Sequence, residues 1–282
     1  MSSKVAMGAV RFMVAGLFSV VAAAPALAQS NSQGLLSDSL VINAGVFVLG
    51  TDVKGRLNGK TTANSDVDFN GTFGKPSDTS RARLDALWRI NPKHHLRFLY
   101  FNDETTRTRA IDRDVAWGDA TYKLGASIEA VTKFTVYELA YEYAFVREPT
   151  YQVAASGGVH YVDMSLQLSG AATVNGGTVA QFSRQSSALP APLPVIGLRA
   201  GWAVSPQWYL GAQAQAFAIK VEGYDGTWTD VRLDATWMFS RHFGIGMGYN
   251  YFGATINVDR PAFNGRLDLG YSGVQAFLTG SF

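Results

Sequence analysis

The chain has 282 residues, 24 basic and 22 acidic side chains, no cysteine, and 12% aromatic residues. Without cysteine it cannot form a disulfide, a thiolate metal site, a cysteine nucleophile or a lipidated N-terminal cysteine. Its near balance of charge gives no global argument for a nucleic-acid partner, and the sequence contains no phosphate-binding glycine loop, dinucleotide fingerprint or nucleic-acid-binding module.

Residues 1–28 have the features of a secretory signal peptide. Lys4 and Arg11 make a basic start, residues 10–24 are apolar, and residues 26–28 give a small-residue cleavage site. We expect cleavage after Ala28, which leaves residues 29–282 as one exported domain with equal numbers of basic and acidic side chains. An uncleaved anchor is the alternative, but the apolar run is shorter than the about 20 residues that a spanning helix needs.

The mature sequence alternates apolar and polar residues with a period of two, which is typical of β-strands with two unlike faces. The clearest stretch is 230–239, where Asp230, Arg232 and Asp234 oppose Val231 and Leu233. In chain order the alternation predicts ten strands, over residues 40–49, 81–90, 95–103, 127–145, 151–164, 193–204, 208–219, 230–239, 243–258 and 266–282.

The predicted connections alternate in length. Short turns are expected at 91–93, 147–150, 205–206 and 240–242. Three polar stretches, 51–80, 104–125 and about 165–189, are predicted to be long loops. Short turns at one end and long loops at the other, with an even strand number, are typical of bacterial outer-membrane barrels, and a soluble β-sandwich has no reason to show this asymmetry.

The chain resembles the small outer-membrane β-barrel proteins of Gram-negative bacteria, the OmpA-like and OmpW-like group. The resemblance rests on the leader, on the alternation, on aromatic residues at strand ends, and on a last strand with Gly273 that closes on Phe282. It implies an all-β, antiparallel transmembrane β-barrel of about ten strands, with eight as the alternative, short periplasmic turns and long extracellular loops. Eight strands are usual in these families, and we expect no peptidoglycan-binding domain after Phe282.

The same resemblance implies a place in the cell outer membrane, in contact with its lipid and lipopolysaccharide. Gly273 and Phe282 are then similar to the insertion signal that the barrel-assembly machinery reads.

If the apolar faces meet lipid, the polar faces line the lumen. The predicted lumen charges are nearly balanced, which suits an ion-pair network better than a selectivity ring of one sign. Barrels of about eight strands are filled by side chains, whereas open pores need about 16. The predicted network consists of Arg81, Arg83, Asp85, Arg89, Arg97, Glu138, Glu142, Arg199, Asp230, Arg232 and Asp234.

The leading hypothesis is therefore a largely plugged barrel with a structural or interaction role in the cell envelope. The alternative is a narrow channel for ions or small apolar solutes, because Gly244, Gly246 and Gly248 face inward and leave space. We predict no catalytic residue, cofactor or metal site.

The candidate reactive residues are few. His160 is the one histidine expected in the lumen, as a satisfied interior side chain or a lumen ligand, while the other three, His94, His95 and His242, are placed at periplasmic turns. A hydrolase at the outer rim that uses Asp66, Asp68 or His160 is the least favoured hypothesis, because no motif places a partner beside them.

Two groups of loop charges have alternative interpretations. Arg107, Arg109 and Arg113 contact lipopolysaccharide phosphates or pair with nearby acids. The acids Asp66, Asp68 and Asp78 bind a divalent cation, which could bridge to lipopolysaccharide, or belong to a solvated loop; because they lack the spacing of a calcium loop, we favour the solvated loop.

Overall fold

The computed structural model describes residues 31–59, 64–75, 80–174, 177–221, 223–260 and 263–282; the expected signal peptide and Asp78 lie outside them. The elements are α1 (Asn31–Ser37), β1 (Leu40–Leu57), β2 (Val67–Asp68), α2 (Phe69–Phe73), β3 (Ser80–Arg89), β4 (His94–Ala110), β5 (Val115–Trp117), β6 (Ala120–Tyr122), β7 (Ser127–Arg147), β8 (Tyr151–Val174), β9 (Gly177–Ala203), β10 (Trp208–Val221), β11 (Tyr224–Met238), β12 (Phe243–Arg260) and β13 (Phe263–Ser281).

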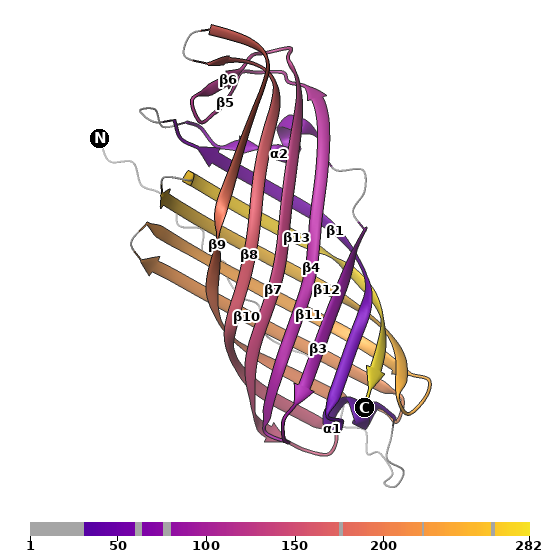
Figure 1. The fold of residues 1–282 in the computed structure, drawn as a ribbon. Helices are drawn as coiled ribbons and strands as arrows, with labels where there is room; N and C mark the ends of the chain where they lie inside the picture. The colour runs from indigo at the N-terminus through magenta and orange to yellow at the C-terminus, as the bar shows by residue number, and fades with distance from the viewer. Residues whose placement is uncertain (1–30, 60–63, 76–79, 175–176, 222, 261–262) are drawn as a thin grey trace, which may run out of the picture.

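Ten of the described strands close into one antiparallel barrel (Figure 1). Going round the ring, the order is β8, β7, β4, β3, β1, β13, β12, β11, β10 and β9, and β9 pairs again with β8. The first and last strands meet along a seam that runs from the Val41–Ser281 pair to the Leu57–Gly265 pair. The all-β barrel of about ten strands is confirmed. Neither described helix is long and apolar enough to span a membrane.

Several strands are longer than the sequence predicts. β4 continues to Ala110, so much of the predicted loop 104–125 is strand, and residues 115–122 form the β5–β6 hairpin. The predicted loop over about 165–189 is wrong, because β8 and β9 continue as one hairpin to Val174 and Gly177. These stretches look like loops in sequence because their outward side chains are polar.

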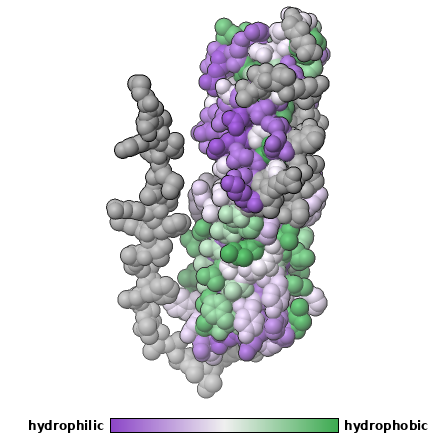
Figure 2. All heavy atoms as spheres, turned by 90° about the vertical axis from the view of Figure 1, so that its left-hand side faces the viewer, coloured by the Kyte–Doolittle hydropathy of each residue, from purple (hydrophilic) through white to green (hydrophobic). Residues whose placement is uncertain are grey.

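Exposed apolar side chains form a belt on the half of the barrel next to the short turns, the end predicted to be periplasmic; one face of it is visible in Figure 2. On β7, its outward side chains run from Tyr137 to Phe145. At about 3.3 Å per residue and a strand tilt of about 40°, this stretch is about 20 Å high, near the about 25 Å band of membrane barrels. Other exposed members of the belt are Trp88, Trp202, Trp208, Leu210, Leu233, Phe239, Phe243, Ile245, Met247 and Tyr249.

The other half of the barrel has the opposite arrangement. Its outer face is polar (Figure 2), and its interior is filled by an apolar cluster, which we call the upper core. Phe101 packs edge-to-face against Phe47, Phe134 and Tyr271, with ring centroids 5.4–6.0 Å apart. The ring centroids of Trp117 of β5 and Phe69 of α2 are 5.7 Å apart, so α2 and the β5–β6 hairpin contribute to this core.

The two helices lie at opposite ends of the barrel (Figure 1). α2 packs with the upper core, where Phe69 and Phe73 are buried. α1 lies at the turn end, where Leu35 and Leu36 are buried against Tyr209 and Met238. Apolar side chains therefore fill the barrel at both ends.

Candidate functional site in the barrel lumen

Two buried glutamates of β7 organise one part of the lumen, within the height of the apolar belt. Glu142 accepts hydrogen bonds from Arg97 Nε and Arg199 Nε, both at 2.8 Å. Arg97 Nη2 also lies 2.6 Å from Glu138 Oε1, the oxygen to which Gln215 Nε2 donates at 2.7 Å. Both carboxylates are at most 1% exposed. Because the five residues come from β4, β7, β9 and β10, the group joins several strands across the lumen.

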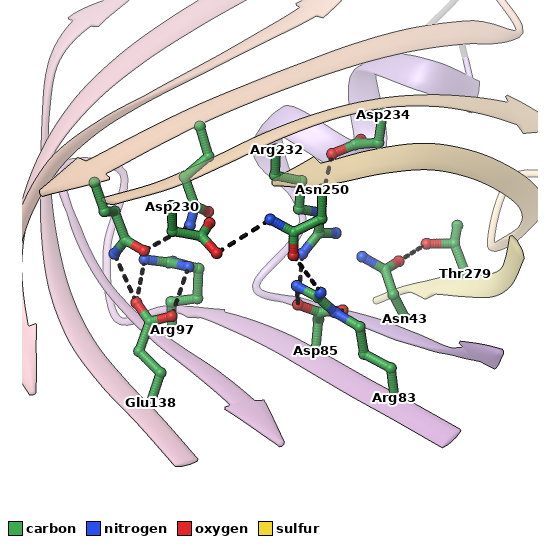
Figure 3. Close-up of polar contacts among 12 residues, drawn as sticks. Asn43, Arg83, Asp85, Arg97, Glu138, Asp230, Arg232, Asp234, Asn250 and Thr279 are labelled. Carbon is green, nitrogen blue, oxygen red and sulfur yellow. Dashed lines mark hydrogen bonds and ion pairs between the residues drawn. The ribbon is translucent and has the colours of Figure 1, made fainter. Parts of the chain in front are cut away.

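A second group surrounds Asp85 of β3 (Figure 3). Asp85 Oδ1 lies 2.5 Å from Arg232 Nη1, and Asp85 Oδ2 lies 3.2 Å from Arg83 Nε. Arg232 Nε is 3.4 Å from Asp234 Oδ1 on the same strand. One carboxylate thus lies between two guanidinium groups from opposite sides of the seam.

Asn250 of β12 extends this second group. Its side-chain oxygen accepts from Arg83 Nη1 at 2.7 Å, and its amide nitrogen donates to Asp230 Oδ2 at 3.1 Å (Figure 3). The alternation in β12 predicts that Asn250 faces inward, but the predicted network contains charged residues alone and leaves Asn250 out. A buried uncharged amide is a connection that charge counting does not find.

His160 of β8 lies where the ion-pair network meets the upper core. Its Nε2 is 2.7 Å from Glu138 Oε2. Its ring stacks on Trp228 of β11, with centroids 4.5 Å apart. The side chain is buried, as predicted for a lumen histidine.

The prediction that His95 sits in a periplasmic turn is wrong. His95 is the second residue of β4, its side chain is fully buried, and its Nδ1 lies 3.9 Å from Glu142 Oε2. The strand begins at His94, so alternation from Arg97 back to the turn places His95 inside. Because the predicted strand 95–103 contains both residues, the parity of Arg97 places His95 inside, in conflict with its assignment to the turn.

Two predicted members lie outside these groups. Arg81 pairs with Asp103 of β4, nearer the loop end. Arg89 forms no ion pair with a carboxylate among the described residues; it donates to two main-chain oxygens, from Nη2 to Leu35 O of α1 at 2.5 Å and from Nη1 to Asp38 O, just after α1, at 2.6 Å. The sequence places Arg89 correctly inside, but its partners belong to a helix that the sequence analysis did not predict.

The lumen groups combine charges of both signs at short range. Unpaired charges in such a place are costly, whereas paired and hydrogen-bonded charges offset each other's desolvation. A ring that selects ions would need one sign of charge around an open path. This arrangement instead crosslinks the barrel wall and occupies its interior.

Space left beside the network is small. A cavity of ≈ 80 Å³ lies between Leu35 of α1 and the guanidinium groups of Arg97, Arg199 and Arg232, a volume suited to roughly a few waters. The three inward glycines do not leave the expected space. A Cβ on Gly246 would stand 2.3 Å from Phe277 Cζ, and one on Gly244 would stand 2.6 Å from Met238 Sδ.

The residues of the rim-hydrolase hypothesis are not brought together. Asp68 is the N-cap of α2, where Oδ1 accepts from Gly71 N at 2.9 Å. Asp66 lies 3.5 Å from Arg56 Nη1, whereas His160 is buried in the lumen. Among the described residues, no three histidines or acids are grouped so that they could hold a metal ion.

The three loop arginines do not form one surface. Arg107 faces the barrel interior at 5% exposure, so of its two interpretations the contact with lipopolysaccharide is wrong. Arg109 is exposed, and Arg113 Nη2 donates to Thr72 Oγ1 of α2 at 3.0 Å. Arg107 and Arg109 stand two residues apart on β4 and share the inward parity, but Arg109 is the next-to-last residue of the strand, where the side chains of both faces are exposed.

Gly273 and Phe282 both belong to the barrel seam. A Cβ on Gly273 would stand 2.1 Å from Val48 O, so the two seam strands approach closely there. Phe282 exchanges backbone hydrogen bonds with Leu40, each at 2.8 Å, and its ring stacks on His242.

Comparison with known proteins shows which known fold the barrel resembles. Neither the protein-family models nor the curated proteins match the sequence. The outer membrane protease OmpT of Escherichia coli matches with a TM-score of 0.57 and 12% identity, over 86% of this chain and 96% of OmpT. This chain has the fold of an outer-membrane β-barrel protein. The apolar belt and the short turns beside it fit that fold, because outer-membrane barrels carry an outward apolar band and have short periplasmic turns.

Two other solved structures of outer-membrane proteins are more distant in shape. Ail, the attachment invasion locus protein of Yersinia pestis, has a TM-score of 0.33 and 10% identity, over 86% of this chain and 99% of Ail. The toluene transporter TodX of Pseudomonas putida has a TM-score of 0.37 and 9% identity, over 89% of this chain and 91% of TodX. At such identities the likeness to OmpT concerns the fold alone, and neither of these two supports an argument about activity.

Proposed function

We propose that this protein is a sealed outer-membrane barrel that stabilises the envelope and displays its extracellular half to the surroundings. The observation that carries the proposal is the filled lumen. From the periplasmic side outward, it contains α1, the ion-pair groups around Glu138, Glu142 and Asp85, and the upper core. Each layer uses the interaction suited to its position, and side chains of the described residues occupy the lumen in all three layers.

The outward part of the proposal rests on the long strands. On β8, the strand continues from Tyr161, at the edge of the belt, to Val174. At about 3.3 Å per residue and the usual tilt, this extension projects on the order of 30 Å beyond the membrane. Its polar outer face provides a broad surface for contact with molecules outside the cell.

A solute-uptake assay tests the sealing. Proteoliposomes that contain the purified barrel are placed in arabinose, and their swelling is compared with that of protein-free liposomes. We expect equal rates, because a lumen filled by side chains should not admit a sugar. Swelling at the rate of an open porin would overturn the proposal in favour of a channel.

An envelope assay tests the structural role. Cells that lack the protein should take up the hydrophobic dye N-phenyl-1-naphthylamine faster than cells that contain it, and the intact gene should restore the barrier. If loss of the protein leaves dye uptake unchanged, the envelope role is rejected even where the barrel is sealed.

A further inference from the structure

α1 lies in the periplasmic mouth, where contacts with the barrel wall stabilise it. It has seven residues, fewer than an isolated helix needs to be stable in water. Leu35 and Leu36 are buried against side chains of the barrel wall. These wall residues are Val41, Leu87, Ala203, Tyr209 and Met238.

Polar contacts fix both ends of α1 to the barrel. At the N-terminal end, Ser32 donates from its backbone N to Pro206 O at 3.1 Å and from Oγ to Ser205 O at 2.5 Å. At the C-terminal end, Arg89 donates to the carbonyls of Leu35 and Asp38. A cation at the C-terminal carbonyls of a helix is also favoured by the helix dipole.

Asp38 is the most densely bonded residue of this segment. Arg241 donates to both carboxylate oxygens, each at 2.6 Å, and Ser281 Oγ donates to Oδ2 at 2.7 Å. Burial alone would raise the pKa of Asp38, but the hydrogen bonds from Arg241 and Ser281 outweigh it, so the pKa is lowered. Paired, charge-assisted bonds of this kind are among the stronger contacts in proteins.

The partners of α1 and Asp38 come from places far apart in the sequence. They belong to β3, the β9–β10 turn, the β11–β12 turn and the end of β13. Asp38 itself stands two residues before β1. These parts become neighbours when β1 has paired with β13, so an open sheet does not present the complete docking site.

We propose that α1 and Asp38 form a latch that docks once the barrel has closed and then holds the periplasmic end of the β1–β13 seam shut. The latch acts where the seam would fray first, at its terminal pairs. There Ser39 Oγ already donates to Phe282 O at 3.0 Å, next to the Leu40–Phe282 backbone bonds. The device is independent of whether the barrel conducts, because it concerns the wall and not the lumen.

Amide hydrogen exchange of the folded protein tests the latch. Asp38→Asn keeps the size of the side chain but removes the negative charge of the carboxylate to which Arg241 and Ser281 donate hydrogen bonds. We expect exchange to rise about tenfold in peptides that cover 39–45 and 276–282, and to stay unchanged in peptides that cover the β7–β8 turn. Unheated samples on a gel first show that each variant is folded.

Asp114→Asn is the matched control. Asp114 accepts hydrogen bonds from Lys123 Nζ at 2.7 Å and from Leu124 N at 2.9 Å. The substitution therefore also weakens bonds from a cation and from a second donor, but far from the seam. Its seam exchange should equal that of the wild type. If Asp38→Asn leaves seam exchange unchanged, or speeds the seam and the β7–β8 turn equally, the latch is overturned.

Gly34→Ala separates the latch from simple helix stability. A Cβ at this position of α1 would stand 2.3 Å from Arg241 Nη1 and 2.8 Å from Asp38 Oδ2, so it would push apart the paired bonds. Alanine is a better helix former than glycine, so helix stability alone predicts slower exchange. We expect faster exchange at the seam, and slower exchange would contradict the latch.

Discussion

The two halves of this barrel use the same backbone and the same alternation with opposite chemistry. On β4, Arg97, Leu99 and Phe101 all face inward, yet the first belongs to the ion-pair network and the other two belong to the upper core. Outside, Phe98 lies in the belt, whereas Glu104 pairs with Lys133 in water. The surroundings of the outer face decide which chemistry fills the interior.

The physical reason is that water surrounds the wall in one half and lipid surrounds it in the other. In the extracellular half, water surrounds the wall, so burial of apolar side chains inside stabilises the fold as in a soluble protein. In the membrane half, lipid accepts apolar side chains on the outside, and hydrogen bonds and ion pairs fill the inside. The protein is therefore a soluble β-barrel on top of a membrane β-barrel, with continuous strands.

Breaking the ionic interior should give the largest effect. Glu142→Gln removes the charge between Arg97 and Arg199, leaving two buried guanidinium groups without it. We expect the free energy of unfolding to fall by about 3–5 kcal/mol, as measured by urea denaturation in detergent micelles. The control is Glu104→Gln, whose exposed pair with Lys133 should contribute about 1 kcal/mol or less. Equal losses would contradict the buried network.

Adding a charge to the outer face should distinguish the two halves directly. Leu139 and Val131 both face outward on β7, but Leu139 lies in the belt. Leu139→Arg should cost about 2–4 kcal/mol, since an arginine there meets lipid. Val131→Arg meets water and should change stability by about 0.5 kcal/mol or less. The account fails if the two substitutions cost the same in folding titrations with lipid vesicles.

Truncating the upper core should have the next effect. Leu99→Ala leaves a hole beneath the apolar cluster and should cost about 2–3 kcal/mol, the lower part of the range for buried leucines, because Leu99 lies at its edge. Leu139→Ala, the same truncation on the lipid face, should cost about 1 kcal/mol or less. Thermal unfolding measures the stability of the two variants. A larger loss of stability for Leu139→Ala would argue against the opposite chemistry of the two halves.

We expect the smallest effect from the pH dependence of stability that Asp38 contributes at the turn end of the barrel. The folded-state pKa of Asp38 lies below the ordinary value of 3.8, so its bonds contribute fully above about pH 4 and are lost as the pH falls through the lowered pKa. The melting temperatures of wild type and Asp38→Asn should therefore differ at pH 7 and converge below pH 3.8. A difference that does not shrink as the pH falls below 3.8 would show that Asp38 is not the group concerned.

The sequence could predict the barrel because the belt half follows a simple pattern. In β3, β7 and β11, apolar side chains face lipid and charges face inward, so the alternation gives the strand and its faces together. That is why Asp85, Glu138, Glu142 and Arg232 were placed correctly inside.

The extracellular half could not be predicted in the same way. Around Thr105 and Arg107, the outward side chains of β4 are polar, and a polar stretch resembles a loop when lipid is assumed outside. Bulges in the β8–β9 pairing, near Met164 and Ala172, also shift the register. α1 is too short for a helical period, so its contacts with Arg89 and Asp38 emerge from the fold.

Planar-bilayer recording of the purified protein is the most direct test of the sealed lumen. The account predicts no steady open-state conductance in the wild type, because α1, the ion pairs and the upper core occupy the lumen in succession. Stable, reproducible conductance steps of porin size in the wild type would contradict it.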